Sequence, residues 1–224
     1  MAKTGKVAIM ASASSRDRQC VAVVPGIGYF PGFLDRAEQE ALRDDIRAVL
    51  DEAPLFRPRM PRTGKPFTVR MSNCGPLGWV SDESGYRYQE RRPESGRPWP
   101  AMPPRLIEIW TRLVPGAPLP EACLINVYDE GAKMGLHQDR DEAALSVPVA
   151  SLSLGSSALF RVGGLSRSDS TRSLRLNSGD ALTFGGPARL IFHGIDRILP
   201  ASSTLLAEGG RINLTLRRVS QAGD

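Results

Sequence analysis

The C-terminal half of the chain is divided into short segments in which apolar and polar residues alternate. Clusters such as Gly163-Gly164 and Gly185-Gly186-Pro187 separate the segments, which is typical of short strands joined by turns. Eight strands are predicted, at residues 122–128, 135–139, 149–154, 158–162, 173–176, 180–184, 189–194 and 211–218. Because no internal repeat accompanies them, this pattern favours an all-β barrel or jelly roll.

The N-terminal half contains two predicted helices that we interpret as supports of the β core. Residues 20–33 predict a short strand and turn, after which Asp35 and Glu38 form an acidic variant of the capping box. Apolar residues at helical spacing then continue to about Leu50. A second amphipathic helix is predicted after Pro103-Pro104. At 224 residues, of which 41% are hydrophobic, the chain is long enough for one well-buried core with an appended lid.

The chain has only two histidines, and both lie near candidate strands. One opens the triplet His137-Gln138-Asp139, and the other is His193, in an apolar stretch. A non-haem Fe(II) site needs two neutral imidazoles and one carboxylate on one face of the metal, which leaves positions open for a co-substrate and O2. His137, Asp139 and His193 can supply one such set. The alternative is a chance H-x-D motif with a structural histidine in the core.

The last predicted strand carries two arginines on one face. Its alternation places Arg211, Asn213, Thr215 and Arg217 together, opposite three apolar residues. If this face is exposed, the strand is an ordinary half-buried one. If it faces the histidines, a planar guanidinium can pair bidentately with a dicarboxylate that chelates the metal, and Asn213 can add a hydrogen bond.

A basic and aromatic segment precedes the second helix. No acidic residue lies between Glu52 and Asp82, which indicates a phosphate-contacting surface or, alternatively, a solvated basic loop. The basic residues there are Arg57, Arg59, Arg62, Lys65 and Arg70. Aromatic residues that are suited to stacking on bases, or to forming the apolar underside of a lid, follow at Trp79, Tyr86, Tyr88 and Trp99. The net charge of +5 agrees with an anionic partner.

Cysteine usage and the N-terminus indicate the compartment. Cys20, Cys74 and Cys123 are scattered, with no spacing typical of disulfides or zinc. No apolar run is long enough for a membrane span, and the start of the chain is not a convincing signal peptide. We therefore expect a cytoplasmic protein without membrane contact, whose residues 1–20 form a flexible N-terminus.

Several motifs, in order, closely resemble the AlkB family of Fe(II)/2-oxoglutarate-dependent nucleic-acid dealkylases. They are NVYDEGAKMGLHQDRDE, VASLSLG, FRVGGLSR, GDALTFGG, RLIFHGI and RINLTLRR. The segments MSNCGPLGW, GYRY and RPWPAMPP resemble its bacterial DNA-repair members. The resemblance covers about residues 55–218. It implies a double-stranded β-helix (jelly roll) core at 116–220, preceded at 21–115 by an extension with buttress helices and a nucleotide-recognition lid, within one structural domain.

The resemblance also implies three sets of site residues. Fe(II) would be held by His137, Asp139 and His193. The 2-oxoglutarate set would be Leu124, Asn126, Tyr128, Arg211, Asn213 and Arg217. The substrate set would be Trp79, Tyr86, Arg87, Tyr88, Asp141, Glu142 and Arg167, with Asp141 near the alkylated base. Two features depart from the family pattern: residues 54–69 are more basic and proline-rich, and Phe184 replaces a tryptophan.

The implied activity is oxidative dealkylation of N-alkylated bases, such as N1-methyladenine and N3-methylcytosine, in DNA, with RNA as a further candidate. Decarboxylation of 2-oxoglutarate would be coupled to hydroxylation of the alkyl group, which leaves as an aldehyde. The base must be single-stranded or flipped to reach a buried metal. A monomer is expected. The alternatives are an oxygenase acting on protein or a small molecule, a non-catalytic nucleic-acid-binding module, and a zinc hydrolase, which would not explain the paired arginines.

Overall fold

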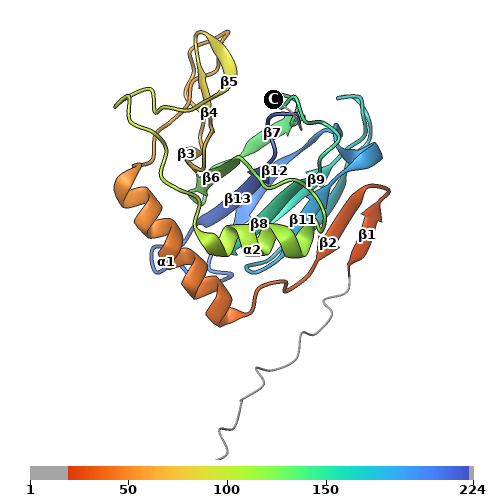
Figure 1. Ribbon diagram of the computed structural model, residues 1–224. Helices are drawn as coiled ribbons and strands as arrows, with labels where there is room; N and C mark the ends of the chain where they lie inside the picture. Colours follow the sequence, from red (N-terminus) through yellow and green to blue (C-terminus); the bar gives the residue numbers. More distant parts are fainter. Residues whose placement is uncertain (1–19, 222–224) are drawn as a thin grey trace, which may run out of the picture.

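The computed structural model describes residues 20–221, whose strands form two sheets and one separate hairpin (Figure 1). The larger sheet contains, in spatial order, β1 (Val21–Val24), β2 (Ile27–Phe30), β11 (Ala181–Phe184), β8 (Val149–Gly155), β13 (Arg211–Arg217), β6 (Ala122–Tyr128) and β3 (Arg70–Cys74). The smaller sheet contains β10 (Arg172–Leu176), β9 (Ser157–Val162), β12 (His193–Leu199) and β7 (Met134–His137). The hairpin consists of β4 (Gly78–Asp82) and β5 (Gly85–Gln89). Neighbouring strands pair antiparallel throughout.

The two sheets share an apolar core. Leu124, Leu182 and Phe184 of the larger sheet belong to the same buried cluster as Phe160 and Val162 of the smaller sheet. Four adjacent strands of each sheet, β11-β8-β13-β6 and β10-β9-β12-β7, together make the eight strands of a jelly roll. The predicted fold class, mainly β with flanking helices around a jelly roll, is therefore confirmed.

The two helices cover the other face of the larger sheet (Figure 1). Helix α1 (Arg36–Glu52) and helix α2 (Pro104–Leu113) contribute Ile46 and Trp110 to a cluster that includes Leu214 of β13. Every residue of β13 is buried, or nearly so, because one face meets this cluster and the other looks between the sheets. The half-exposed alternative for this strand is thus excluded.

The start of α1 follows its sequence signal. The Asp35 carboxylate accepts a hydrogen bond from the Glu38 N–H at 2.9 Å, and the Glu38 carboxylate accepts one from the Asp35 N–H at 2.8 Å. This reciprocal pair satisfies two backbone donors at the helix start. The capping box predicted from the sequence is confirmed.

One predicted strand is misplaced. Residues 189–194 read as a strand because they are largely apolar, but the 3-10 helix η1 (Gly186–Ala188) leads into a turn there. The Ile191 N–H donates to the Ala188 carbonyl at 3.3 Å, which closes this turn. Strand β12 begins only at His193 and continues to Leu199. An apolar run therefore did not by itself indicate strand pairing.

The β4–β5 hairpin projects beside the open end of the sheets and was not predicted as strands (Figure 1). The Asn73 amide joins it to β3, because it donates to the Trp79 carbonyl and accepts from the Trp79 N–H, both at 3.0 Å. Gly78 is required at its start, since a Cβ atom there would lie 2.3 Å from the Trp99 ring.

Two further expectations concern the ends of the chain and membranes. Residues 1–19 of the predicted flexible N-terminus lie outside the described residues. Across residues 20–221, no helix combines the length and apolar character needed to cross a membrane.

Candidate active site

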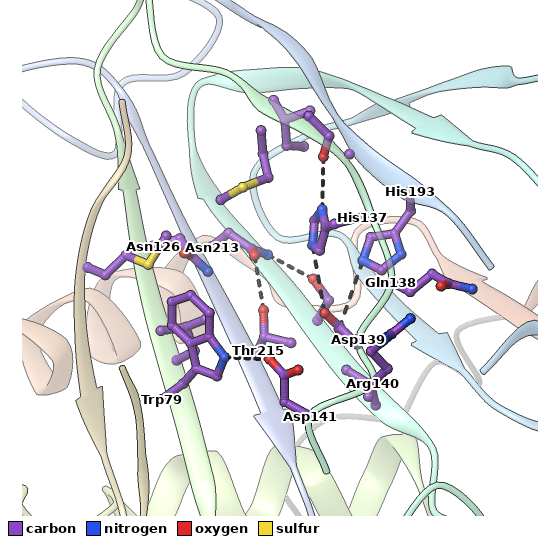
Figure 2. A pocket seen from close by; sticks show the side chains of 18 of the residues that line it. Trp79, Asn126, His137, Gln138, Asp139, Arg140, Asp141, His193, Asn213 and Thr215 are labelled. Carbon is purple, nitrogen blue, oxygen red and sulfur yellow. Dashed lines mark hydrogen bonds and ion pairs between the residues drawn. The ribbon is translucent and has the colours of Figure 1, made fainter. Parts of the chain in front are cut away.

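Strand pairing brings the two histidines together between the sheets. His137 ends β7 and His193 begins β12, and the two are direct cross-strand partners with ring centroids 4.5 Å apart. Asp139 follows β7 and points its carboxylate at both rings (Figure 2). Its Oδ1 lies 3.7 Å from His137 Nε2, and its Oδ2 lies 3.9 Å from His193 Nε2. Three ligand atoms, all within 4.8 Å of one another, can close on a single metal ion.

Backbone carbonyls orient both imidazoles for ligation. His137 Nδ1 lies 2.9 Å from the Gly135 carbonyl and His193 Nδ1 lies 3.1 Å from the Ile191 carbonyl. Donation from Nδ1–H leaves the Nε2 lone pair facing Asp139, as a metal requires. Burial, and then the neighbouring His137, lower the pKa of His193 to about 4, so this ring is neutral at pH 7.

The carboxylate of Asp139 is held ionised. Burial alone would raise its pKa, but the positive charge of Arg217, with smaller contributions from His193 and His137, outweighs burial and holds the pKa well below its ordinary value. Arg217 Nη2 donates to Asp139 Oδ2 at 2.7 Å. The His193 imidazole and the Asp139 carboxylate are therefore in the protonation states that Fe(II) binding needs.

Arg211 offers the clearest anchor for a carboxylate. Its side chain is 1% exposed, and Nη2 donates to Ser153 Oγ at 2.9 Å. Its Nε and Nη1 have no partner among residues 20–221, and neither has the buried Asn126 Oδ1. Its guanidinium lies over the Tyr128 ring, 5.4 Å from the centroid. Since buried donors are normally paired, these two N–H groups fit the carboxylate of 2-oxoglutarate.

The residues of the 2-oxoglutarate set line one cavity, which has a volume of about 510 Å³. They differ in how many hydrogen-bonding groups remain free for a ligand. The Asn213 amide donates to Ser151 Oγ at 2.8 Å and to the Leu152 carbonyl at 2.9 Å, and it accepts from Thr215 at 3.1 Å. Its donors are thus engaged within the protein (Figure 2). Leu124 supplies apolar wall.

The mouth of the cavity is built from the β4–β5 hairpin and the segment after Asp139. Trp79 stacks on Tyr86 with ring centroids 5.6 Å apart, and its indole N–H donates to Asp141 at 2.9 Å (Figure 2). The Tyr88 hydroxyl donates to Glu142 at 2.5 Å. These five residues were predicted as substrate residues, together with Arg167, which lines the same cavity, and the structure brings them together.

Arg87 lies apart from this group. It is not among the lining residues, and it forms two 2.8 Å hydrogen bonds to Asp82, whose pKa falls to about 2 because of this partner. Any contact with substrate would need this ion pair to open. The structure places Gln138 and Arg140 on the cavity wall, although sequence reasoning did not select them. Their position beside the two ligands of the His137-Gln138-Asp139 triplet was the available signal.

Some basic residues of the segment 57–70 are paired within the protein, and others are exposed. Arg70 pairs with Asp129 at 2.7 Å, and Arg57 donates to the Thr68 carbonyl at 2.7 Å. Arg59 donates to the Gly64 carbonyl at 2.9 Å. Arg62 and Lys65 are exposed, in and beside the turn at residues 61–63 in the middle of this segment. Part of the positive charge therefore stabilises the segment itself, and the phosphate-contacting role remains a prediction for the rest.

Comparison with known proteins identifies the family. The model of the 2OG-Fe(II) oxygenase superfamily matches residues 26–217. The α-ketoglutarate-dependent dioxygenase AlkB homolog of Caulobacter vibrioides is 56% identical over 200 residues, covering 89% of this chain and 90% of the relative. The α-ketoglutarate-dependent dioxygenase AlkB of Escherichia coli K12 is 40% identical over 193 residues, covering 84% and 88%.

More distant relatives share the same core. The DNA N(6)-methyladenine demethylase ALKBH1C of Arabidopsis thaliana is 31% identical over 224 residues, covering 87% of this chain and 48% of the relative. The solved structure of OsALKBH1 superposes with a TM-score of 0.77 at 30% identity, covering 89% of this chain and all of that one. Together with a metal triad and a carboxylate anchor that fit Fe(II) and 2-oxoglutarate, these matches show that the chain belongs to the AlkB family of 2OG-Fe(II) oxygenases.

Proposed function

We propose that this dioxygenase removes alkyl groups oxidatively from nucleic-acid bases. The observation that carries the proposal is the mouth of the metal cavity, where the stacked pair Trp79 and Tyr86 lies beside the carboxylate of Asp141. An aromatic face attracts any base, at about 1 to 3 kcal/mol per stacked base. A relative whose name describes a DNA demethylase supports the same substrate class.

Each residue set has a separate task in this reaction. His137, Asp139 and His193 would hold Fe(II), and Arg211 would bind a carboxylate of 2-oxoglutarate through its unpartnered N–H groups. When bound, Fe(II), 2-oxoglutarate and O2 would supply the oxidising chemistry that hydroxylates the alkyl carbon. The hydroxylated alkyl group then leaves as an aldehyde. The protein binds and orients the reactants, and the apolar wall formed by Phe160, among others, limits the entry of water.

The charge at the mouth favours cationic lesions. N1-methyladenine and N3-methylcytosine carry a positive charge, which the Asp141 carboxylate can complement once the Trp79 N–H releases it. The base must leave its stack to reach the cavity, at a cost of a few kcal/mol that is smallest for damaged or unpaired bases. We therefore propose DNA carrying these lesions as substrate, with RNA as a second candidate polymer.

The remaining assignments are part of the same proposal. Residues 21–115 would form the extension with buttress helices and a nucleotide-recognition lid, and residues 116–220 the catalytic core. The β4–β5 hairpin supports the lid assignment, since it supplies Trp79, Tyr86 and Tyr88 to the cavity. Cysteines that are free thiols among the described residues support a cytoplasmic location, and a monomer is part of the same proposal.

The direct test is the mass of a single-stranded DNA oligonucleotide that carries one N1-methyladenine, after incubation with enzyme, Fe(II), 2-oxoglutarate and air. Loss of one methylene unit that depends on iron and on 2-oxoglutarate is expected. Asp139→Ala should abolish the reaction, because it removes one of three metal ligands. Trp79→Ala should instead raise the KM for DNA and leave substrate-independent succinate formation unchanged. An unchanged oligonucleotide with continuing succinate release would refute the proposed substrate and retain the oxygenase.

A further inference from the structure

Asp139, Arg217, Glu142 and Arg189 form a closed ring of buried charged contacts. Arg217 donates to the Asp139 carboxylate at 2.7 Å, and its Nε lies 3.0 Å from Glu142 Oε1. Glu142 Oε2 accepts from Arg189 Nη2 at 2.9 Å. Arg189 Nη1 donates to the main-chain carbonyl of Asp139 at 2.5 Å, which closes the ring on the residue where it began.

The ring balances its charges and excludes water. Two guanidinium groups face two carboxylates, and the side chains of Arg189 and Glu142 are 4% and 2% exposed. Loss of one member of such a group leaves an uncompensated buried charge, which is far more costly than loss of a surface pair. The ring therefore has a strong preference for one arrangement, and Asp139 is part of it.

Arg189 has no contact with the reacting groups. It does not line the cavity, and its third contact runs from Nε to the carbonyl of Val147, at 3.1 Å, a residue that does not line the cavity either. A planar guanidinium can satisfy three acceptors in fixed directions, which a lysine ammonium cannot reproduce. Its only route to the chemistry is through the residues that it holds, Asp139 and Glu142.

We propose that Arg189 is a positioning residue for the metal site. Arg217 fixes the carboxylate of Asp139 and Arg189 fixes its main chain, so that the Cα–Cβ bond points the carboxylate at His137 and His193. Glu142 joins the two arginines and keeps both in place. The Tyr88 hydroxyl, bound to Glu142, fastens the β4–β5 hairpin to the same ring.

The test measures metal binding by Arg189→Met and Arg189→Lys with Co(II) alone as the probe. The expected result is a loss of about 10- to 100-fold in Co(II) affinity for Arg189→Met, the range found when groups that orient metal ligands are removed. The visible Co(II) absorption spectrum should change as well, because the geometry of the ligands relaxes. Arg189→Lys keeps the charge and should retain only part of the affinity.

A matched control separates positioning from general stability. Arg43→Met removes an arginine of α1 that donates to the Leu205 carbonyl at 3.2 Å and does not line the cavity. This variant should keep Co(II) affinity within about twofold of the wild type. If Arg189→Met is folded and binds Co(II) with wild-type affinity and spectrum, the proposal is wrong.

A second variant covers the case in which Arg189→Met does not fold. Glu142→Gln preserves the shape of the ring and removes the charge that both arginines share. We expect weaker Co(II) binding and an altered spectrum from it, and wild-type values would contradict the proposal. None of these titrations involves nucleic acid, so the result is independent of the substrate proposed above.

Discussion

Arg211 is a charged residue that the fold keeps incompletely paired. Burial lowers its pKa, yet two of its N–H groups have no partner in the part of the chain that the structure describes. A buried unpaired donor costs free energy, which a bound carboxylate would recover as charge-assisted hydrogen bonds. The sequence indicated this role conditionally: strand alternation grouped Arg211 with Asn213 and Arg217 on one face, and a carboxylate-binding role followed if that face looked toward the histidines.

Replacement of Arg211 by lysine tests this role. The ammonium keeps the charge but not the planar fork, so the affinity for 2-oxoglutarate should fall by about 10- to 100-fold, as expected for a loss of roughly 1.5 to 3 kcal/mol. Calorimetric titration of the Co(II)-loaded protein with 2-oxoglutarate measures it. Co(II) affinity itself is the internal control and should be unchanged. An unchanged 2-oxoglutarate affinity would remove Arg211 from the binding site.

Helix α1, whose start depends on residues that are neighbours in the chain, was predicted more accurately than strand β12, which depends on distant partners. The start of α1 depends on Asp35 and Glu38, which are neighbours in the chain, and it was predicted correctly. Strand β12 depends on pairing with β7 and β9, and its start was misplaced because an apolar run does not reveal its partners. The β4–β5 hairpin is an exception, because its two strands are neighbours in the chain and pair across a short turn, yet they were not predicted as strands.

The end of β13 contains a carboxylate whose contribution to stability depends on pH. Glu121 accepts backbone hydrogen bonds from Val219 and Ser220, at 2.9 and 2.7 Å, and lies 3.4 Å from Arg218. Burial would raise its pKa, but these partners outweigh burial and lower it from 4.5. A lowered carboxyl pKa stabilises the fold above the unfolded pKa, and the contribution disappears as pH falls through the folded pKa.

We therefore expect Glu121→Gln to be less stable than the wild type at pH 7 and to differ from it less at pH 4. Thermal unfolding at several pH values between 7 and 4 measures the difference in Tm. Glu83→Gln, at an exposed position in the turn of the hairpin, is a suitable control for the loss of one negative charge. A difference in Tm that is constant with pH would contradict the assigned role of Glu121.

For the whole molecule, the site exists only when the two sheets are assembled. The metal triad comes from β7, the segment after it and β12, and the carboxylate anchor from β13 of the other sheet. Residue types and order predicted these members. They did not predict the contact of Arg189 with Asp139, because Arg189 lies in the turn after a 3-10 helix, where no strand alternation indicates which side chains are buried.

Ligands that bind across both sheets should stabilise the whole fold. At a concentration 100 times its Kd, a ligand adds about 2.7 kcal/mol, and about 1 kcal/mol raises the Tm of a domain of this size by roughly 2 to 4 °C. Co(II) with 2-oxoglutarate should thus raise the Tm by about 5 to 10 °C. A chelator should reverse the shift, and Asp139→Ala should not show it. Equal stabilisation of Asp139→Ala would indicate binding elsewhere.

Trp79, whose indole N–H donates to Asp141, is also a natural fluorescent probe of the cavity. Of the three tryptophans, Trp99 and Trp110 are buried in apolar clusters, whereas Trp79 stands at the cavity mouth against Tyr86. A base that enters must change the surroundings of this indole, and the other two keep theirs. Intrinsic fluorescence should therefore follow occupancy of the cavity in real time, without a label and without turnover.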